Sequence, residues 1–416
     1  MKKGGVHMFQ RAIKKQVEIA LNNYPVVMIT GAKGVGKTTL VHEFVKEKNF
    51  DYVSLEYISH RKLAIKDPKY FLQQFHFPLI IDEVQYAPIL FEVIEEIVNM
   101  KRLETGEANG MFLLTGSQAF HLMKNVTQSL AGRASIIQME PLGLDEIMQR
   151  ETEIYIPTQN RTCLYQNDNP LDVKEIFQLI CKGMYPELYR SEKEINDYYE
   201  NYVSTYVDRD ITEFINVKDK IKFHDFLEYL AAMTSQQVNA ADLGRRLGIS
   251  GKTIQNWLSI LEATGLIYFL QPYNDHSIAK RIVRTSKMYF SDTGLATFLI
   301  KMNHPETLRI SNLSGAFFET FVVNEIRKTF LNNKQPFQAY YYRDNNQNEV
   351  DLVLLYEGKM SLIEIKQGVS FNLGSVKGFK QLEGSMYPIE NRVIVCNTLK
   401  SYPLSRDVQV VPVSSI

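Results

Sequence analysis

One eight-residue segment constrains this chain more than any other part of its sequence. Residues 31–38 read Gly-Ala-Lys-Gly-Val-Gly-Lys-Thr, the full G-x-x-x-x-G-K-[ST] pattern. The segment follows a short apolar run, Val26–Ile29, and precedes residues with helical spacing, Thr38–Lys48. Glycines let backbone N–H groups turn toward phosphate oxygens without a Cβ clash, and the following helix directs the positive end of its dipole at them. The sequence therefore predicts a phosphate-binding loop between a strand and a helix of a parallel α/β fold.

A second segment completes the expected nucleotide site. Phe77–Glu83 is an apolar strand that ends in Asp82 and Glu83, at the sheet edge where α/β folds bind ligands. Lys37 is expected to reach the β- and γ-phosphates, and Thr38 to ligate Mg²⁺ together with Asp82. Glu83 is expected to polarise the attacking water as a general base. The residues expected to bind ATP are Gly31, Ala32, Lys33, Gly34, Val35, Gly36, Lys37, Thr38, Thr39 and Ser117.

A third predicted strand, Met111–Thr115, leads to two further candidates. Ser117 and Gln118 follow it and are expected beside the same crevice. Arg133 comes later, and two interpretations of it stay open. It senses the γ-phosphate, in its own chain or in a neighbouring subunit, or it pairs with a carboxylate on the surface.

These segments together resemble a known family. The similarity is to a prokaryotic family of AAA-type ATPases in which the ATPase is fused to a C-terminal region of unknown function. It implies ATP and Mg²⁺ as ligands and ATP hydrolysis as the activity. The residues that carry it are 31–38, Ile80–Gln85, Leu113–Ser117, Gly132-Arg133 and Pro141-Leu142, and it continues through Gly183–Glu187, Asp208–Ile211 and Lys287–Leu295 to the end of the chain.

The middle of the chain predicts a helical connector and a winged helix. Residues 173–182 and 192–214 have helical spacing. Three more helices are expected at 223–236, 240–247 and 251–264, the last two capped by Asn239 and Ser250. This spacing is typical of a helix-turn-helix.

The third of these helices has a polar face suited to nucleic acid. It carries Lys252, Gln255 and Asn256, side chains that contact phosphates and base edges. A hairpin over residues 266–270 and 277–283 is expected next. The stretch 276–287 contains four basic residues and no acid: Lys280, Arg281, Arg284 and Lys287. It predicts a local basic patch for DNA, and the alternative is a winged helix that docks protein or acts as a rigid spacer.

The last part of the chain predicts a second α/β domain. A helix over Gly315–Leu331 precedes strands at 338–343, 349–355 and 360–366, a helix at 373–382 and a strand at 392–396. This α-β-β-β-α-β order resembles that of restriction-endonuclease-like folds.

Four residues on these elements resemble the E…D…E-x-K site of that superfamily. Asp351 and Glu364 are expected to share a Mg²⁺ that polarises a phosphodiester. Lys366 projects to the same face as Glu364 and would orient or activate water, while Glu319 would complete the shell. The superfamily's proline before the aspartate is replaced by Val350. The alternative is a nuclease-like scaffold that only binds or has no activity.

Composition limits which partners and which cellular compartment are expected for the chain. Lys plus Arg and Asp plus Glu each number 47, so nucleic-acid binding must come from a local patch. The three cysteines, Cys163, Cys181 and Cys396, are far apart, which excludes a zinc ribbon and favours a reducing cytoplasm. No run approaches the roughly 18 apolar residues that span a bilayer, so no membrane partner is expected. The N-terminus, with Lys2 and Lys3 but no apolar core after them, does not predict a secretory signal.

These expectations define an architecture and a function. The predicted domains are an AAA-type P-loop ATPase (1–150), a helical connector (151–219), a winged helix (220–300) and a nuclease-like domain (301–416). The predicted function is ATP binding and slow hydrolysis as a switch that controls nucleic-acid engagement. Two alternatives stay open: an ATP-gated, metal-dependent nuclease, and a signalling scaffold that binds protein. Self-association is a further open possibility.

Overall fold

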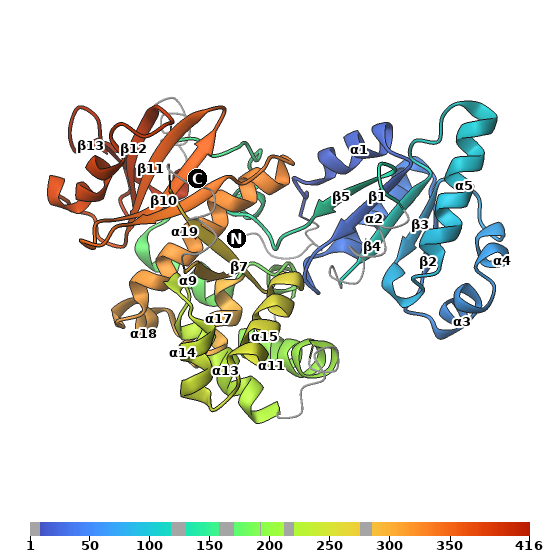
Figure 1. The fold of residues 1–416 in the computed structure, drawn as a ribbon, viewed down its shortest axis with the longest axis horizontal. Coiled ribbons are helices and arrows are strands. Elements are labelled where there is room, and N and C mark those ends of the chain that lie inside the picture. The colour runs from blue at the N-terminus through green and yellow to red at the C-terminus, as the bar shows by residue number, and fades with distance from the viewer. Residues whose placement is uncertain (1–8, 118–129, 158–169, 192, 212–219, 275–284) are drawn as a thin grey trace.

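The computed structural model describes residues 9–117, 130–157, 170–191, 193–211, 220–274 and 285–416 of the 416-residue chain (Figure 1). Five residues that the sequence singled out lie outside these ranges: Gln118, Cys163, Lys280, Arg281 and Arg284. The N-terminal sheet and its helices, in blue, occupy one side of the molecule, and the C-terminal strands, in orange and red, occupy the other.

The N-terminal half is built on a parallel sheet. Its described strands number five and run in the order β2-β3-β4-β1-β5, with every neighbouring pair parallel. Strands β1, β3 and β4 consist of buried residues throughout, which is why their sequences read as continuous apolar runs. The strands are β1 (Val26–Thr30), β2 (Asp51–Ser54), β3 (Leu79–Asp82), β4 (Phe112–Gly116) and β5 (Ala134–Gln138). The helical elements are α1 (Lys14–Asn23), α2 (Lys37–Lys48), α3 (Ile58–Lys66), α4 (Pro68–Gln73), η1 (Val84–Tyr86), α5 (Leu90–Thr105) and α7 (Leu144–Ile147).

One edge of this sheet gathers the predicted nucleotide residues. The loop 31–38 follows β1, Asp82 ends β3, and Thr115 lies near the end of β4. Because parallel strands end at the same edge, these three segments meet there. The predicted order of strand, loop and helix is confirmed, since β1 ends at Thr30 and α2 begins at Lys37.

A helical region follows the ATPase-like half. It contains α9 (Val173–Lys182), α10 (Glu187–Arg190), α11 (Ile195–Tyr202) and η2 (Val203–Ile211). The helical structure expected over 192–214 is present in the described residues Ile195–Ile211, where the chain changes from an α-helix to a π-helix at Val203. The wider π-turn keeps Tyr202, Tyr206 and Ile211 buried although their spacing changes from four residues to five.

The next segment has the helices that the sequence predicted. They are α13 (Lys220–Ala232), α14 (Ala240–Leu247) and α15 (Gly251–Ala263). Two further helices, which the sequence analysis did not name, come later: α17 (Thr293–Leu299) and α18 (Pro305–Ile310). The predicted caps are confirmed: Asn239 accepts from two N–H groups at the start of α14, and Ser250 accepts from Thr253 N at 3.0 Å. The expected second hairpin strand at 277–283 lies largely outside the described residues. Instead β7 (Ile267–Pro272) pairs antiparallel with β8 (Lys287–Phe290), and β8 pairs with β6 (Gln236–Gln237).

The C-terminal strands continue this small sheet instead of forming a separate one. The described strands of the whole sheet number nine, in the order β13-β14-β12-β11-β10-β9-β7-β8-β6. The junction is the parallel pair β7–β9, where Gln271 lies opposite Tyr340. The boundary predicted at residue 300 therefore does not separate two sheets. The strands are β9 (Ala339–Arg343), β10 (Glu349–Tyr356), β11 (Lys359–Lys366), β12 (Ile389–Cys396), β13 (Tyr402–Pro403) and β14 (Gln409–Pro412).

One C-terminal helix differs from its prediction. Residues Leu373–Leu382 form the 3₁₀ element η3, interrupted by non-helical dihedrals at Val376, and the short 3₁₀ turn η4 (Val413–Ser415) comes near the end. The backbone at Gly378 approaches β10 so closely that a Cβ there would lie 2.0 Å from Glu349 O. Glycine in the segment permits this contact and lowers its preference for an α-helix.

Helix α19 (Ser314–Asn332) joins the C-terminal half to the end of the ATPase-like half. Lys328 Nζ donates to Leu142 O at 2.9 Å and to Glu325 at 2.7 Å, and Glu325 accepts from Leu144 N at 2.6 Å. These groups are buried, so their mutual pairing holds the two halves together. Neither α19 nor any other helix of the described residues is long and apolar enough to cross a membrane.

We expect Lys328→Met to lower the free energy of unfolding by about 3–5 kcal/mol, because it leaves the Glu325 carboxyl buried without its ammonium. Urea denaturation measures the change. The matched control is Lys193→Met, which removes an exposed ion pair with Glu187 and should cost less than about 1 kcal/mol. Equal losses of unfolding free energy in the two variants would contradict the proposed role of Lys328 and Glu325 in holding the two halves together.

Candidate nucleotide site and a second polar cluster

The phosphate loop is closed by its own lysine. Glycines stand where the backbone has positive φ, 149° at Gly31 and 98° at Gly36. A side chain at position 31 would also clash, since a Cβ on Gly31 would lie 2.2 Å from Met139 O. Lys37 Nζ donates to Gly31 O at 2.9 Å and to Ala32 O at 3.0 Å. The ammonium therefore lies inside the loop, where phosphate oxygens are expected.

Burial governs the charge of this lysine. Lys37 is buried, which lowers the pKa of its ammonium, while the carboxylates of Glu83 and Asp82 act in the opposite direction. A polyphosphate adds negative charge beside the same group and favours its protonated form. Phosphate binding and protonation of Lys37 therefore support each other.

A group of oxygen donors adjoins the loop. Thr38 Oγ1 and Tyr52 OH each donate to Asp82 Oδ2 at 3.0 Å, and the Thr115 hydroxyl donates to the other carboxylate oxygen. Burial raises the pKa of Tyr52, so its hydroxyl stays a donor. A hydroxyl and a carboxylate in contact are oxygen donors of the kind that Mg²⁺ takes beside nucleotide phosphates. The donor set of Thr38 and Asp82 fits that ion.

Glu83 lies at the same edge, one residue beyond β3. Its backbone is left-handed, with φ 56°, and its N–H donates to Thr115 Oγ1 at 3.0 Å. Its carboxylate accepts from Ser117 Oγ at 3.1 Å and from the side-chain amide of Gln85. The structure thus brings Glu83 and Ser117 together with the loop, and two neutral donors hold the carboxylate.

Several residues that contact the loop were not predicted from the sequence as members of the site. Arg11 donates to Val35 O at 2.6 Å and to Glu140 O at 2.7 Å, and it pairs with Glu146 at 3.0 Å. It therefore holds the back of the phosphate loop. Tyr52 is equally unmarked in the sequence, because only the pairing of β2 with β3 brings it to Asp82. Thr115 and Gln85 lie in segments that carry the family resemblance, but no role was predicted for them from the sequence.

A small cavity lies on the α2 side of the loop. Its lining joins the N-terminal segment, the first turns of α2 and the start of α10. Among the lining residues are Phe9, Gly36, Thr39, Pro186 and Arg190. The cavity has a volume of about 30 Å³, space for about one water molecule, so it does not accommodate a nucleoside in this structure.

The tip of the loop contacts the rest of the molecule. A Cβ on Gly34 would lie 3.2 Å from Tyr198 OH, and Lys33 Nζ lies 5.7 Å from the Tyr206 ring centre. Gly265, directly after α15, is close enough to the loop that its Cβ would lie 3.6 Å from Ala32 N. The loop is therefore packed against both the connector and the end of α15.

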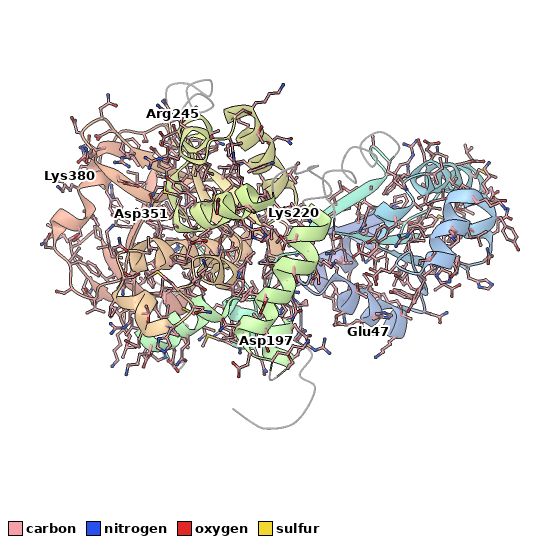
Figure 2. All side chains as sticks on the ribbon, turned by 90° about the horizontal axis from the view of Figure 1, so that it is seen from below. Glu47, Asp197, Lys220, Arg245, Asp351 and Lys380 are labelled. Atoms are coloured by element: carbon pink, nitrogen blue, oxygen red, sulfur yellow. The ribbon has the colours of Figure 1, made fainter. Side chains whose placement is uncertain are left out.

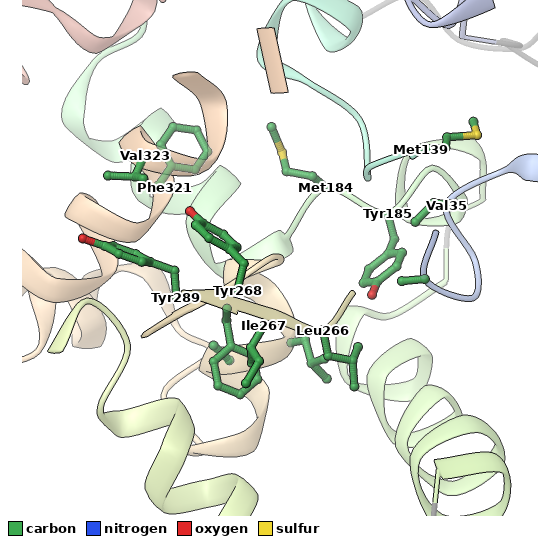
Figure 3. Packing of buried hydrophobic residues seen from close by; sticks show 14 of the residues in the cluster. Val35, Met139, Met184, Tyr185, Leu266, Ile267, Tyr268, Tyr289, Phe321 and Val323 are labelled. Carbon is green, nitrogen blue, oxygen red and sulfur yellow. The ribbon is translucent and has the colours of Figure 1, made fainter. Parts of the chain in front are cut away.

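Apolar side chains extend this contact into the C-terminal half. Val35 of the loop and Met139 after β5 belong to the same buried cluster as Tyr185, Leu266 and Tyr268. Figure 3 shows these residues following one another from the phosphate loop to the sheet and on to α19. The nucleotide loop and the sheet that carries β7 thus share one hydrophobic core.

Arg133 does not reach the nucleotide loop of its own chain. It precedes β5, and the start of β5 pairs with the start of β1, at the edge opposite the phosphate loop. Its guanidinium bonds to Asn99 at 2.9 Å and pairs with Glu95 at 3.3 Å. Surface pairing is what the structure shows, and a role toward a neighbouring subunit stays a prediction.

The predicted nucleic-acid residues on α15 lie on its surface. Lys252, Gln255 and Asn256 are exposed, while Ile254 and Trp257 face the core. The predicted basic partners Lys280, Arg281 and Arg284 are outside the described residues.

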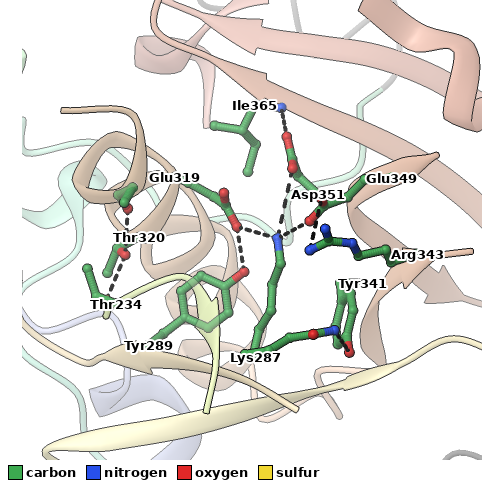
Figure 4. A network of polar contacts seen from close by, with 12 residues as sticks. Thr234, Lys287, Tyr289, Glu319, Thr320, Tyr341, Arg343, Glu349, Asp351 and Ile365 are labelled. Carbon is green, nitrogen blue, oxygen red and sulfur yellow. Dashed lines mark hydrogen bonds and ion pairs between the residues drawn. The ribbon is translucent and has the colours of Figure 1, made fainter. Parts of the chain in front are cut away.

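The four nuclease-like candidates lie in the half of the molecule marked by Asp351 in Figure 2, with Asp351 on β10, Glu364 and Lys366 on β11, and Glu319 on helix α19. Lys366 Nζ is 2.6 Å from Glu364 and 3.4 Å from Asp351. Lys287 lies between Glu319, at 3.1 Å, and Asp351, at 4.0 Å (Figure 4). Its inclusion in an exposed basic patch was wrong, because the β7–β8 pairing places Lys287 in the protein interior.

Burial shifts the acids of this cluster strongly. It raises the pKa of Glu364 to about 8, assisted by the charge of Asp351 and opposed by Lys366. It also raises the pKa of Glu319 to about 7, against the ammonium of Lys287. Burial acts to lower the pKa of Lys287, but the surrounding carboxylates outweigh it and the net shift is upward. The two lysines oppose these shifts without cancelling them, so Glu364 and Glu319 are partly protonated near neutral pH.

The expected Mg²⁺ does not fit this second cluster as it stands. In the described part of the chain, no group of three or more His, Cys, Asp or Glu side chains is arranged to hold a metal ion. The position between Glu319 and Asp351 is filled by the ammonium of Lys287.

Three family models match successive parts of the chain. Residues 23–148 match a model described as AAA domain, residues 173–306 match a domain of unknown function (DUF8612), and residues 314–416 match a domain of unknown function (DUF4143). Together with the loop and sheet described above, the first match identifies a P-loop AAA domain of the ATPase type in residues 23–148. The C-terminal match assigns no activity.

Curated relatives cover almost the whole chain. The uncharacterized proteins Mb2031c of Mycobacterium bovis and Rv2008c of Mycobacterium tuberculosis are each 26% identical over 408 residues, which is 95% of this chain and 82% of theirs. Similarity along nearly the full length shows that the order of the parts is shared.

Solved structures resemble the chain more distantly. The Walker-type ATPase PABY2304 of Pyrococcus abyssi is 16% identical with a TM-score of 0.41, covering 70% of this chain and 96% of that one. The RuvB Holliday junction branch migration motor of Thermotoga maritima is 17% identical with a TM-score of 0.30, covering 62% and 88%. Likeness at this level indicates neither an activity nor a partner.

Proposed function

We propose that this protein binds Mg²⁺-ATP at residues 31–38, hydrolyses it slowly, and uses the nucleotide state to control its engagement of nucleic acid. The observation that carries the proposal is the contact between Thr38 and Asp82, 3.0 Å at the end of the phosphate loop. It joins the two halves of a magnesium-nucleotide site that are 44 residues apart in the chain. The AAA domain match over residues 23–148 supports the same activity.

The residues of the site divide the chemistry among them. Lys37 exchanges the carbonyls of Gly31 and Ala32 for phosphate oxygens, so loop opening accompanies binding. Mg²⁺ bound with the nucleotide neutralises phosphate charge. Glu83 accepts the proton of the attacking water, for which its carboxylate leaves the donors Ser117 and Gln85. Hydrolysis is slow as long as those two donors hold Glu83.

The phosphate loop also meets the connector. A Cβ on Gly34 of the loop would lie 3.2 Å from Tyr198 OH of α11. A change in the shape of the loop on nucleotide binding would therefore act on the position of the connector.

The link to nucleic acid runs through α15. The order α13, β6, α14, α15, β7, β8 is that of a winged helix, and the exposed face of α15 presents Lys252, Gln255 and Asn256. Gly265, two residues beyond the end of this helix, lies beside the phosphate loop, since a Cβ there would be 3.6 Å from Ala32 N. A loop that changes shape on ATP binding therefore acts directly on the helix proposed to contact DNA.

The test is duplex DNA binding by fluorescence anisotropy, with ATP and without it, over a range of salt concentrations. We expect the affinity to change with nucleotide, and Lys252→Ala to reduce the slope of log affinity against log salt by roughly 0.9, the contribution of one phosphate contact. Lys69→Ala, an exposed lysine on α4, is the matched control and should leave the slope unchanged.

An unchanged slope in Lys252→Ala would move the contact surface away from α15. Equal DNA affinity in both nucleotide states would refute the switch. Absence of DNA and RNA binding in every state would favour the alternative of a protein-binding scaffold.

A further inference from the structure

An open groove lies at the edge of the N-terminal sheet opposite the phosphate loop. Its volume is about 770 Å³, and its walls are the segments that lead into β3 and β4 and the second half of α5. The apolar side chains of the lining include Phe75, Phe77, Ile97, Met100 and Met111. In Figure 1, α5 lies on the side of the N-terminal sheet that faces away from the C-terminal strands. The described C-terminal half therefore does not cover the groove.

Apolar side chains are exposed to solvent in and beside this groove. Phe77 is 41% exposed and Met100 is 54% exposed. Leu103 follows Met100 by one turn of α5 and is 88% exposed, so it lies next to the groove. A single exposed leucine is common on protein surfaces, but a leucine that adjoins an apolar groove forms a continuous patch of the kind that binds another protein. The same surface thus offers a groove and a side chain that fits into one.

The charged residues of the groove indicate which protein it binds. Lys101 and Glu104 both line the groove and are exposed, and in the described part of the chain neither belongs to an ion pair. In an interface with two-fold symmetry, each residue meets its counterpart's partner twice, once in each direction. If two antiparallel α5 helices cross midway between positions 101 and 104, Lys101 of each copy lies opposite Glu104 of the other. The charges beside the groove are therefore complementary to a second copy of the same surface.

We propose that two copies of this chain associate through the exposed face of α5, with the two α5 helices antiparallel. Leu103 of each copy enters the groove of the other, beside Phe77 and Met100, and the pairs of Lys101 with Glu104 flank this apolar centre. A second copy supplies both the apolar side chain and the matching order of charges, which is why it is favoured over an unrelated partner. This inference is independent of the nucleotide site, because the phosphate loop lies at the opposite edge of the sheet.

The experiment is sedimentation velocity of the nucleotide-free full chain over a range of protein concentrations. We expect a reversible dimer for wild type. Leu103→Glu should weaken the dimer by about a hundredfold or more, because each dimer contains two copies of the substituted residue and a loss of about tenfold is expected for each. Ile310→Glu is the matched control, since Ile310 is 75% exposed on α18 and lies outside the proposed interface.

Charge exchange tests the symmetry of the interface. Lys101→Glu alone should weaken the dimer about tenfold or more, because like charges then face each other twice in each dimer, and Glu104→Lys alone should do the same. Combining Lys101→Glu with Glu104→Lys should restore the dimer to within about threefold of wild type, because opposite charges meet again with their signs exchanged. An unrelated partner would not produce this rescue.

Circular dichroism and ATP binding follow the folding of each variant, and the substituted side chains are exposed, so folding should persist. A wild-type chain that stays monomeric at every concentration would overturn the proposal. A dimer that survives Leu103→Glu would overturn it as well, as would two weakened single charge variants without rescue in their combination.

Discussion

Glu83→Gln is expected to slow ATP hydrolysis by about 10²–10⁴-fold while leaving ATP affinity close to that of wild type. The amide cannot accept the proton of the attacking water. Glu83 acts on Lys37 through its charge, which favours the protonated ammonium, and the bound phosphates supply the same effect, so we expect affinity to change little. An amide at this position can still bond to Ser117 and Gln85, so the local geometry should persist.

Phosphate release under single-turnover conditions gives the rate, and titration with a fluorescent nucleotide gives the affinity. Glu92→Gln is the matched control, because Glu92 is exposed on neighbouring helix α5. Turnover in Glu83→Gln equal to wild type would remove Glu83 from the role of general base.

Lys37→Ala is expected to weaken ATP binding by about ten- to a hundredfold, the range for loss of a hydrogen-bonded charged group. The substitution removes the cation that faces the β- and γ-phosphates and also the two bonds to Gly31 O and Ala32 O. Hydrolysis at saturating ATP should fall as well, because the same ammonium stabilises charge in the transition state.

The same nucleotide titration measures this effect, and the matched control is Lys48→Ala. Lys48 ends α2, on the same helix, and pairs with Glu18 at 3.5 Å on the surface. An affinity of Lys37→Ala within about threefold of the control would place the phosphates elsewhere.

The features that the sequence predicted well are those set by neighbouring residues. The loop glycines, the strand before them and helix α2 follow from local backbone preferences. Helix α9 covers the predicted residues 173–182, and α14 begins at the cap Asn239, because capping and apolar spacing act within one or two turns.

The features that it did not predict depend on partners far along the chain. Lys287 appears in the sequence as one of several basic residues without a neighbouring acid, and only the pairing of β8 with β7 brings it to Glu319 and Glu349. Arg133 follows a glycine in a suggestive position, but the direction of β5 decides which edge it reaches. Tyr52 reaches Asp82 for the same reason, since β2 runs parallel to β3.

Strand pairing also joins segments on the two sides of the domain boundary that the sequence predicted. No local signal in the sequence marks the pairing of Gln271 with Tyr340, which crosses the division expected at residue 300. Register between strands depends on which apolar faces meet, and that information lies in both strands together.

The pairing of β7 with β9 has a consequence for how the chain is made. A nascent chain that has reached residue 313 contains β7 and β8 but none of β9, so one edge of β7 offers unpaired N–H and C=O groups. At the same stage Lys287 lacks Glu319 and Glu349, and its ammonium has no acid to accompany it into the interior. The segment that must be synthesised before this sheet can fold is therefore longer than the domain-family match, which ends at residue 306. Swapping the last hundred residues between relatives would exchange six of the nine described strands of the sheet and all the acids that surround Lys287, while Lys287 itself stayed behind.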